Sequence, residues 1–451
     1  MPGKCFQWEA NMNNQKTGRS ILGLALVIML AISTIIVGIA SANTVQTYQN
    51  DRSIDIVSVA SDGTQGNDWS SWPSISQNGC CVAFWSKASN LVSGDSNSFD
   101  DIFVHDQQKG VTEIVSIASD GTQGNGNADY WMDISEKGRY VTFSSDATNL
   151  VAGDTNIQLD VFVRDRQTGT TERVSVASDG SQGIGTSFNP SITSDGRYVA
   201  FQSTSSNLIS GDHFSSDDIF VHDRLTGNTE IVSVSTNGVF GNNSSEYPSI
   251  SHDGHFVAFQ SDATNLVEND TNNRIDIFVH DRELNETTLV SLKSDGSQYG
   301  SHSLVPEISG DGRFVTFAAS PGAVYRHDRM TGKTDIVSEN DPSFPAISGD
   351  GRYVVYEATI ENNSFCHPEN PKDIYVRDMY TGISTCISTS ITGDSKYAPG
   401  NYPSISADGH TIAFTSHSPN LVDGDNNGFQ DIFIFKWSGI QPMFLPISIN
   451  K

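Results

Sequence analysis

Seven copies of one short motif, at nearly constant spacing, constrain the fold of this sequence more than any other feature. Each copy has a Ser-Ile-Ser-like stretch, a turn that ends in glycine, and an apolar run, as in PSITSDGRYVAF from Pro190. The turn glycines are Gly79, Gly138, Gly196, Gly254, Gly312, Gly351 and Gly409, at spacings of 59, 58, 58, 58, 39 and 58 residues. A fixed period of this kind predicts one repeat architecture rather than several separate domains.

Each repeat predicts four strands. The first two are the Ser-Ile-Ser stretch and the apolar run, and a D-I-F-V-H-D segment, a Thr-Gly turn and a T-E-I-V-S-V segment follow. Asp-Gly and Thr-Gly indicate tight hairpins, because glycine adopts a positive φ without steric cost. The two middle strands are apolar at consecutive positions, so both of their faces must be covered. We therefore expect an all-β, seven-bladed propeller of four-stranded antiparallel blades.

The two ends of the repeat array predict how the ring closes. A segment of the fourth-strand type, SIDIVSVA at 53–60, precedes the first repeat, whereas the seventh repeat ends with its third strand, DIFIFK at 431–436. We expect the N-terminal strand to join the last blade as its outer strand, because this closure leaves no open sheet edge. The tail 440–450 is the competing candidate, disfavoured because Pro442 and Pro446 donate no ladder hydrogen bond.

The N-terminal region predicts export. Residues 21–42 carry no charge and follow Lys4, Lys16 and Arg19, a pattern that keeps the N-terminus in the cytoplasm and exports the rest. Ala-Ser-Ala at 40–42 is typical of a signal-peptide cleavage site, but the segment is also long enough to span ~30 Å of hydrocarbon as an anchor. The expected divisions are a signal peptide or membrane anchor at 1–42, a linker at 43–52, the propeller at 53–439 and a tail at 440–451.

The charge balance limits the class of partner. The chain has 26 basic and 53 acidic residues, for a net charge of −27. This field repels phosphates and anionic lipid, so we expect no nucleic-acid partner, and membrane contact only through residues 21–42 if they are uncleaved. We expect the protein to lie outside the cytoplasm, either secreted or anchored to the outer face of the cytoplasmic membrane. In that oxidising compartment Cys366 and Cys386 are candidates for a disulfide, with two free thiols as the alternative.

The motif S-x-D-G-R-Y-V-A-F followed by D-I-[FY]-V-x-D resembles the repeat of the TolB-like propellers, also called WD-like or PD-type. The resemblance covers residues 53–436 and implies the propeller fold. It implies little about function, because propellers host unrelated activities. Two features depart from known relatives: no separate α/β domain stands between the export segment and the blades, and no α/β-hydrolase domain follows them.

The loops between the second and third strands repeat the pattern D-x-N-x-x-x-D. Carboxylate and amide oxygens on one tight loop suit a hard cation such as Ca²⁺, the only cofactor that the sequence suggests. Asp and Asn also form Asx turns with their own backbone, and this is the alternative interpretation. The candidate ligands are Asp95, Asn97, Asp101, Asp154, Asn156, Asp160, Asp270, Asn272, Asp276, Asp425, Asn427 and Asp431.

The single short spacing predicts a notch. Between Gly312 and Gly351 the repeat loses nineteen residues, from the loop at 318–323 and from the link at 339–344. Both belong to the face where the long loops emerge, here called the loop-rich face, at the junction of blades 5 and 6. Drift in a surface loop is the alternative explanation. If the notch binds a partner, the expected contact residues are Tyr325, His367 and Glu369.

These features favour a binding role over catalysis. No G-x-S-x-G, H-E-x-x-H or P-loop motif is present. We expect an exported, cell-surface or periplasm-like propeller that binds a protein or glycan through its loop-rich acidic face without catalysing a reaction. The alternative is a propeller hydrolase or lyase that acts on a polysaccharide with acidic residues, and buried acids with strongly shifted pKa values would favour it. Histidines that recur at one position of the third strand (His105, His222, His280 and His327) indicate a packing or hydrogen-bonding role.

Overall fold

The computed structural model describes residues 52–211, 216–319, 322–359, 372–389 and 400–437. The chain divides into two units, residues 1–50 and 51–451, and every described residue belongs to the second. In these ranges the secondary structure consists of β-strands, without a helix. A helix long and apolar enough to cross a membrane is accordingly not found among them, and the hydrophobic segment 21–42 lies outside them.

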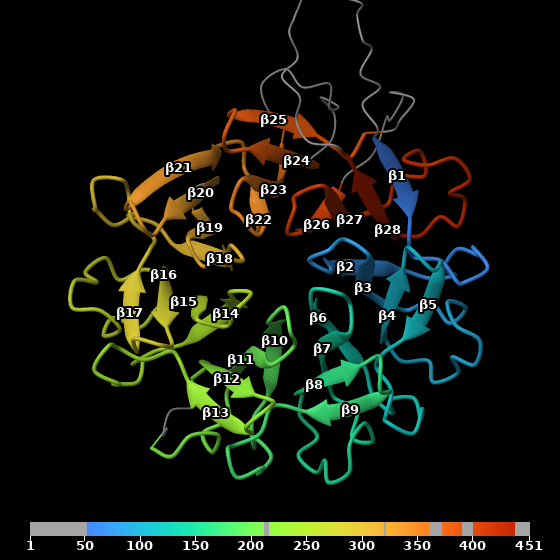
Figure 1. Ribbon diagram of the computed structural model, residues 1–451, viewed down its shortest axis with the longest axis horizontal. Coiled ribbons are helices and arrows are strands. Elements are labelled where there is room, and N and C mark those ends of the chain that lie inside the picture. The colour runs from blue at the N-terminus through green and yellow to red at the C-terminus, as the bar shows by residue number, and fades with distance from the viewer. Residues whose placement is uncertain (1–51, 212–215, 320–321, 360–371, 390–399, 438–451) are drawn as a thin grey trace, which may run out of the picture. The chain divides into compact units, whose positions relative to one another are not determined.

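The described strands form seven four-stranded antiparallel sheets arranged as the blades of a propeller around a central axis (Figure 1). The innermost strands of blades 1 to 7 are β2 (Ser70–Ile75), β6 (Ala128–Ile134), β10 (Ser187–Ile192), β14 (Ser245–Ile250), β18 (Ser303–Ile308), β22 (Ser343–Ile347) and β26 (Gly400–Ile405). The second strands are β3 (Cys81–Ser86), β7 (Tyr140–Ser145), β11 (Tyr198–Ser203), β15 (Phe256–Ser261), β19 (Phe314–Ala319), β23 (Tyr353–Ala358) and β27 (Thr411–Ser416).

The third strands are β4 (Asp101–Asp106), β8 (Asp160–Asp165), β12 (Asp218–Asp223), β16 (Asp276–Asp281), β20 (Ala323–Asp328), β24 (Asp373–Asp378) and β28 (Asp431–Lys436). The outer strands are β5 (Val111–Ile114), β9 (Thr170–Arg173), β13 (Asn228–Ile231), β17 (Glu286–Leu289), β21 (Lys333–Ser338), β25 (Ile383–Cys386) and, for blade 7, β1 (Ser53–Ile56). The seven-bladed, all-β fold predicted from the repeat is confirmed.

Ring closure follows the predicted route. The N-terminal strand β1 pairs antiparallel with β28, from Ser53 opposite Lys436 to Ile56 opposite Phe433. Blade 7 therefore combines the first described strand of the chain with the last three (Figure 1). The competing segment 440–450 lies outside the described residues.

The middle strands of each blade form its core. Phe84 of β3 and Phe103 of β4 are fully buried and stack with ring centroids 5.9 Å apart. The same pair recurs in the other blades, for example Phe143 with Phe162 at 5.8 Å. Because apolar side chains leave both faces of these strands, each blade buries one face against each neighbour, as the consecutive apolar positions predict.

The turn glycines fit between neighbouring blades. Gly196 has a φ of 74°, which a side chain rarely adopts, and a Cβ there would overlap the ring of Tyr140 in the preceding blade. The turn between the first two strands of one blade thus packs directly on the second strand of the blade before it. This spacing keeps the innermost strands close around the axis, where the candidate site lies.

Candidate functional site: a capped central channel

The innermost strands enclose a cavity of ≈ 250 Å³ on the axis of the ring. In every blade the pairing between the first two strands shifts register at the same point, as between Ser71 and Ser74 in blade 1. A bulge of this kind re-aims a side chain. In six blades the residue at the bulge has a φ between 44° and 55°: Trp72, Asn189, Tyr247, Val305, Phe344 and Tyr402. A repeated bulge, rather than a loop, therefore places these side chains in the channel wall.

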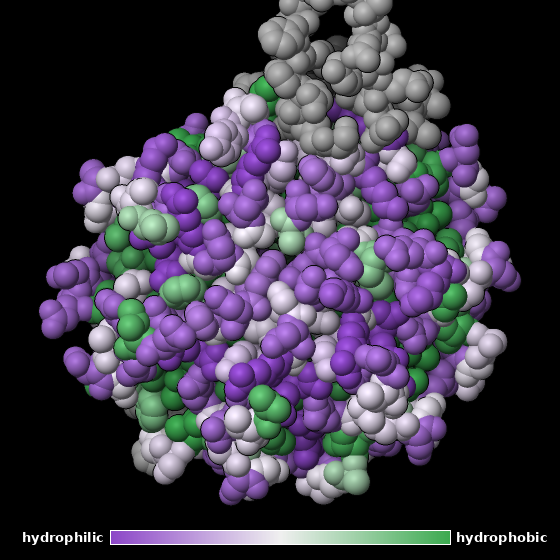
Figure 2. All heavy atoms as spheres, in the orientation of Figure 1, coloured by the Kyte–Doolittle hydropathy of each residue, from purple (hydrophilic) through white to green (hydrophobic). Residues whose placement is uncertain are grey.

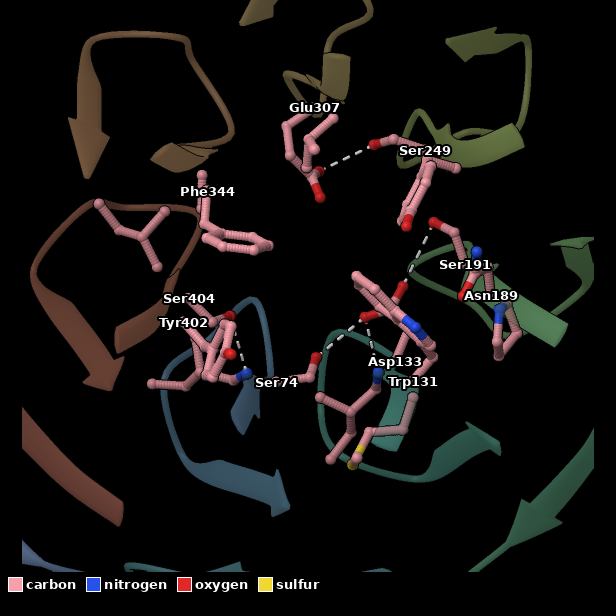
Figure 3. A pocket seen from close by; sticks show the side chains of 18 of the residues that line it. Ser74, Trp131, Asp133, Asn189, Ser191, Ser249, Glu307, Phe344, Tyr402 and Ser404 are labelled. Carbon is pink, nitrogen blue, oxygen red and sulfur yellow. Dashed lines mark hydrogen bonds between the residues drawn. The ribbon is translucent and has the colours of Figure 1, made fainter. Parts of the chain in front are cut away.

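Aromatic side chains gather at this level of the channel. We call the cluster of Trp72, Tyr130, Trp131, Phe344 and Tyr402 the aromatic cap. Trp72 stacks on Tyr402 with ring centroids 3.5 Å apart and on Tyr130 at 4.8 Å, and Trp131 lies 4.7 Å from Trp72. Phe344 packs edge-on against Tyr402 at 5.0 Å. Figure 3 shows Phe344, Trp131 and Tyr402 pointing into the cavity from different blades.

The cap lies toward the loop-rich face, because each innermost strand begins at that face and the cap residues occupy its first half. Tyr130 is 42% exposed, and Trp69, three residues before Trp72, is 47% exposed. Trp69 also contacts His417 of blade 7 edge-on, with centroids 5.8 Å apart. Tyr130 thus exposes aromatic surface at the mouth of the channel, and Trp69 exposes a second ring on the same face, outside the cavity lining.

A ring of mostly polar side chains, with one alanine, lines the channel below the cap. We call these residues the polar belt: Ser74, Asp133, Ser191, Ser249, Glu307, Ala346 and Ser404, one from each blade. Serine hydroxyls of the belt accept hydrogen bonds from the backbone of the next blade. Ser191 Oγ accepts from Ile250 N at 3.2 Å, and Ser404 Oγ accepts from Ile75 N at 3.1 Å. The belt therefore joins blades to one another as well as lining the cavity.

Two carboxyl groups interrupt the serines of the belt. Asp133 accepts hydrogen bonds from Ile134 N at 2.8 Å, Ile192 N at 2.9 Å and Ser74 Oγ at 3.1 Å. Burial nevertheless raises the pKa of Asp133, since desolvation outweighs these donors. Glu307 comes from blade 5 and accepts from Ser249 Oγ at 2.9 Å. Figure 3 shows the two carboxyl groups facing the cavity from opposite sides.

Glu307 has a pKa well above that of an ordinary glutamate. Burial raises its pKa from the ordinary 4.5 to about 7, the hydroxyl of Ser249 lowers it, and the charge of Asp133 raises it further. An acid that titrates near pH 7 inside an enclosed cavity can donate or accept a proton. The channel thus combines an aromatic entrance with a protonatable group beneath it.

Backbone hydrogen bonds tie the other end of the channel. The turns after the innermost strands are linked from blade to blade, for example Glu136 N to Ser194 O at 3.2 Å and His252 N to Gly310 O at 3.0 Å. The remaining links are Asn78 N to Glu136 O, Ser194 N to His252 O, Asp311 N to Gly349 O, Gly349 N to Ala407 O and Ala407 N to Gln77 O. The bonds run around the whole ring, so each blade is joined to the next at this end of the channel.

The predicted metal ligands lie in the loops of the loop-rich face, away from the channel. The loop asparagines are held by the bonds of an Asx turn: Asn97 Oδ1 accepts from Phe99 N at 3.1 Å, and its Nδ2 donates to Gly124 O at 3.2 Å. Asn156, Asn272 and Asn427 make the corresponding bonds. The amide oxygens are thus engaged with the backbone, which leaves the aspartates as the stronger candidate ligands.

The structure brings the two aspartates of each loop together. The second one begins the third strand and accepts a short hydrogen bond from a serine after the outer strand, as from Ser116 Oγ to Asp101 Oδ1 at 2.6 Å. Burial raises the pKa of Asp101 to about 6, and the nearby charge of Asp95 adds to this effect. Groups of three or more His, Cys, Asp or Glu side chains suited to a metal are absent from the described ranges.

The predicted notch is described only in part. Residues 320–322 separate β19 from β20, and residues 339–342 separate β21 from β22, so both connections are as short as the sequence predicts. Tyr325 is half-buried and packs against Tyr299 with ring centroids 4.8 Å apart, away from the channel cavity. His367 and Glu369 lie outside the described residues, and binding at the notch stays a prediction.

The recurrent histidines have the structural role that the sequence suggests. His105 Nδ1 lies 2.8 Å from Thr112 Oγ1, which in turn donates to Val59 O, and His222, His280 and His327 repeat the contact with their own threonines. These bonds fasten neighbouring blades near the rim. Cys386 is disulfide-bonded, whereas Cys366, its predicted partner, lies outside the described residues.

Sequence reasoning missed the aromatic cap and the acids of the belt. The signal for the cap was present, because an aromatic residue directly precedes the P-S-I-S motif or its variant in five of seven repeats: Trp72, Trp131, Tyr247, Phe344 and Tyr402. The acids were visible as departures from the serine of that motif, in M-D-I-S and P-E-I-S. The bulge that aims both positions at the axis has no such signal.

Comparison with known proteins supports the fold. Family models do not match this sequence, and neither do curated proteins. An oligogalacturonate lyase in complex with manganese matches with 14% identity over 86% of this chain and 98% of that chain, at a TM-score of 0.52. An oligogalacturonate lyase from Vibrio parahaemolyticus matches with 15% identity over 86% and 98%, at 0.49. A putative TolB from Agrobacterium tumefaciens matches with 15% identity over 73% and 94%, at 0.41.

The match to the manganese-bound lyase supports the propeller fold that the repeat predicts. At 14% identity it shows the fold alone. The manganese belongs to the lyase in which it was found. What this chain binds must therefore be argued from its own channel and loops.

Proposed function

We propose that this chain is an exported, non-enzymatic binding module that takes a glycan at the channel mouth on its loop-rich face. The observation that carries the proposal is the aromatic cap, in which Tyr130 is exposed, together with the exposed ring of Trp69 on the same face. The C–H face of a sugar ring packs well on an aromatic ring, while its hydroxyl groups require polar partners nearby. The loops around the mouth supply amide, hydroxyl and carboxylate groups.

A glycan fits this face better than a protein does. Hydrophilic side chains cover most of the face shown in Figure 2, and apolar side chains are scattered over it rather than gathered in one patch. Protein interfaces generally centre on a buried apolar or aromatic core. The net charge of −27 and the acids of the polar belt repel anionic chains, so the expected ligand is a neutral glycan.

The binding experiment uses the tryptophans of the mouth as reporters. Purified protein is titrated with neutral oligosaccharides (β-glucan, xylan, mannan and chitin fragments) and with oligogalacturonate, while tryptophan fluorescence is followed. We expect saturable quenching by a neutral glycan, and at least a tenfold loss of affinity in Trp69→Ala and Tyr130→Ala. Leu225→Ala is the matched control, because Leu225 is exposed on the turn between β12 and β13, at the opposite face. The proposal fails if no glycan binds, or if all three variants bind equally.

A second candidate function follows from Glu307. Its pKa of about 7 and the facing carboxyl group of Asp133 are compatible with the acid–base chemistry of a propeller hydrolase or lyase for polysaccharides. The fold permits either role, since an oligogalacturonate lyase shares it. The test is release of reducing ends or of unsaturated products from the same glycans, with Glu307→Gln as the control. Turnover that this variant abolishes would establish the enzyme and overturn the non-enzymatic module.

Export is part of the proposal. It is supported by the uncharged segment 21–42 behind three basic residues and by the disulfide at Cys386, a bond typical of oxidising compartments. Expression with a C-terminal reporter that is active only outside the cytoplasm checks it. A reporter that stays inactive, with the protein retained in the cytoplasm, would rule out export.

A further inference from the structure

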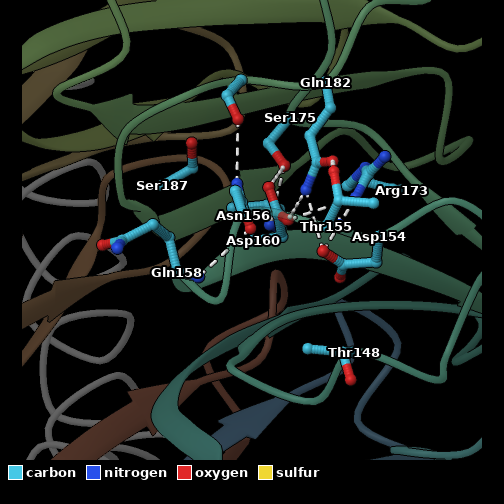
Figure 4. A network of polar contacts seen from close by, with 12 residues as sticks. Thr148, Asp154, Thr155, Asn156, Gln158, Asp160, Arg173, Ser175, Gln182 and Ser187 are labelled. Atoms are coloured by element: carbon cyan, nitrogen blue, oxygen red, sulfur yellow. Dashed lines mark hydrogen bonds and ion pairs between the residues drawn. The ribbon is translucent and has the colours of Figure 1, made fainter.

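The strongest unexplained feature outside the channel is a difference among equivalent loops. In blade 2 the guanidinium group of Arg173 lies between the two loop aspartates, with Nη1 3.4 Å from Asp154 Oδ1 and 3.3 Å from Asp160 Oδ2. All three side chains are buried, and Gln182 Nε2 also donates to both carboxylates, at 2.8 and 3.0 Å. Figure 4 shows this network, in which one positive charge sits between two negative ones.

Blades 1 and 4 keep the aspartates and lack the cation. Arg173 pairs with Phe162 in the blade ladder, and the residues in the same register are Ile114, opposite Phe103, and Leu289, opposite Phe278. Neither can neutralise a carboxylate. The pairs Asp95 with Asp101 and Asp270 with Asp276 therefore carry two acidic groups without the balancing charge that blade 2 supplies.

The unbalanced pairs contain buried oxygens without a hydrogen-bond partner. Asp101 is 1% exposed and Asp276 is 0% exposed, and in each the Oδ2 atom has no donor, although Oδ1 accepts from a serine. Asp270 Oδ2 is also buried without a partner. A buried carboxylate oxygen without a hydrogen-bond donor lowers the free energy of unfolding, because it has lost its hydrogen bonds to water and no protein donor replaces them.

Electrostatics agree with the geometry. Burial raises the pKa of both Asp101 and Asp276 to about 6, offset in part by the serine hydroxyl and the loop asparagine and reinforced by the charge of the first aspartate. In blade 2 burial also raises the pKa of Asp160, but there the charge of Arg173 lowers it in part, an effect that blades 1 and 4 lack. Blade 7 differs in distance: Asn427 Nδ2 donates to Asp431 Oδ2 at 2.8 Å, whereas Asn97 and Asn272 affect the pKa of Asp101 and Asp276 without making a hydrogen bond to Oδ2.

We propose that the loops of blades 1 and 4 each bind a hard divalent cation, Ca²⁺ in the first instance, at the place that the Arg173 guanidinium takes in blade 2. Asp95 with Asp101, and Asp270 with Asp276, supply the carboxylate ligands, and backbone carbonyls and water complete a shell of the kind that Ca²⁺ accepts. Bound cations would fix these loops to their blades on the loop-rich face. A site with two carboxylates has an expected Kd of roughly 10⁻⁴–10⁻³ M, as in extracellular calcium modules.

The test exchanges residues between the equivalent positions of blades 1, 2 and 4. Ile114→Arg gives blade 1 the built-in cation of blade 2, and Leu289→Arg does the same for blade 4. Arg173→Ile removes that cation from blade 2. Calcium binding to the full chain is measured by equilibrium dialysis at pH 7.5, with circular dichroism to confirm the fold of each variant and Mg²⁺ as the ion control.

We expect two calcium ions per chain in the unaltered protein, one in Ile114→Arg and none in the variant that carries both arginines. Arg173→Ile should gain a third site. Asp62→Asn is the matched control, because Asp62 is an exposed loop aspartate outside the pairs, and it should still bind two. The proposal is overturned if the unaltered protein binds no calcium. It is also overturned if the double-arginine variant binds as many calcium ions as the unaltered protein.

Protonation is the competing way to neutralise the pairs. In that case calcium would not change the thermal unfolding midpoint at pH 7.5, and stability would instead fall as the pH rises through about 6, where Asp101 and Asp276 lose their protons. Ile114→Leu, which adds no charge, serves as the control. If calcium leaves the thermal unfolding midpoint unchanged in both this variant and the unaltered protein, and the stability of both falls as the pH rises through about 6, the cation sites are contradicted.

Discussion

Ser58 Oγ donates a 2.6 Å hydrogen bond to Asp431 Oδ1, across 373 residues of sequence. Ser58 Oγ also accepts from Ile432 N at 3.0 Å, so one hydroxyl joins the N-terminal segment to the last strand twice. In blade 1, which consists of consecutive strands, the equivalent bonds link Ser116 Oγ to Asp101 Oδ1 at 2.6 Å and Ile102 N to Ser116 Oγ at 3.0 Å. Blade 7, which closes the ring, therefore makes the same hydrogen bonds as a blade of consecutive strands.

Replacing this hydroxyl should weaken closure. Ser58→Ala leaves a buried carboxylate oxygen and a buried N–H without partners, and we expect a loss of about 1.5–3 kcal/mol in the free energy of unfolding, measured with urea. Ser116→Ala removes the same two bonds within blade 1 and should cost a similar amount. The two variants should differ in hydrogen exchange, because only Ser58→Ala frees β1 and exposes the edge of β28. Equal protection of β1 in both variants would show that closure does not depend on this contact.

Glu307 should make stability depend on pH. Its folded pKa of about 7 lies above its ordinary 4.5, so its contribution to stability is full below pH 4.5 and is lost as the pH rises through 7. The loss should be on the order of 3 kcal/mol between these limits. Glu307→Gln, which has no such charge to bury, should lose less stability from pH 4.5 to pH 8 than the unaltered protein.

Glu136→Gln serves as the control for Glu307, since Glu136 lies in the exposed turn after β6. Urea titrations at pH 4.5, 6, 7 and 8 give the comparison. A Glu307→Gln curve parallel to that of the unaltered protein would mean that the carboxyl group is not buried as described.

The repeated sequence motif predicts the strands well, because each of its features has a structural cause close by in the sequence. Glycine in the hairpins, consecutive apolar residues in the middle strands and a spare fourth strand at the N-terminus each imply one feature of a blade or of the ring. The aspartate pairs of the loops could be predicted as well, since Asp95 and Asp101 lie on one short loop and must be close. Their unequal neighbours, Ile114 and Arg173, become informative only when the register of the outer strands is known.

The channel was harder to predict because it depends on the bulge. Strand alternation alone does not show that Trp72 and Ser74 both face the axis, since the register shift between the first two strands decides this. Asp133 and Glu307 are separated by more than 170 residues, and only the ring brings them to opposite sides of one cavity. A repeat predicts which positions are equivalent, and the closed ring then determines which of them meet.

The bulge of blade 5 should carry backbone strain. Val305 has a φ of 52°, where a β-branched residue is rarely found, while Asn189 takes the equivalent place in blade 3 with a φ of 50°. Val305→Asn should therefore raise the free energy of unfolding by about 1 kcal/mol, with Val305→Ile as a control that keeps the strain. The backbone bond from Val305 N to Gln260 Oε1, at 2.9 Å, remains available in both. A less stable asparagine variant would show that the apolar contacts of Val305 outweigh its strain.

The adjacent thiols of Cys80 and Cys81 should differ in reactivity. Their sulfur atoms lie 3.0 Å apart, Cys81 is buried, and Cys80 is half-buried. A hydrogen bond from the Cys81 thiol holds the pKa of Cys80 well below its ordinary value, whereas the same contact and burial raise that of Cys81. Because the thiolate is the reactive form, iodoacetamide at pH 7 should alkylate Cys80 first, as mass spectrometry of the tryptic peptide can establish. In Cys81→Ala the donor is gone, so the pH at which Cys80 reaches half its maximal rate should rise, and in Cys81→Ser, which keeps a donor, it should rise less. Equal labelling of both thiols, or a Cys80 profile unchanged by Cys81→Ala, would contradict the hydrogen bond between them.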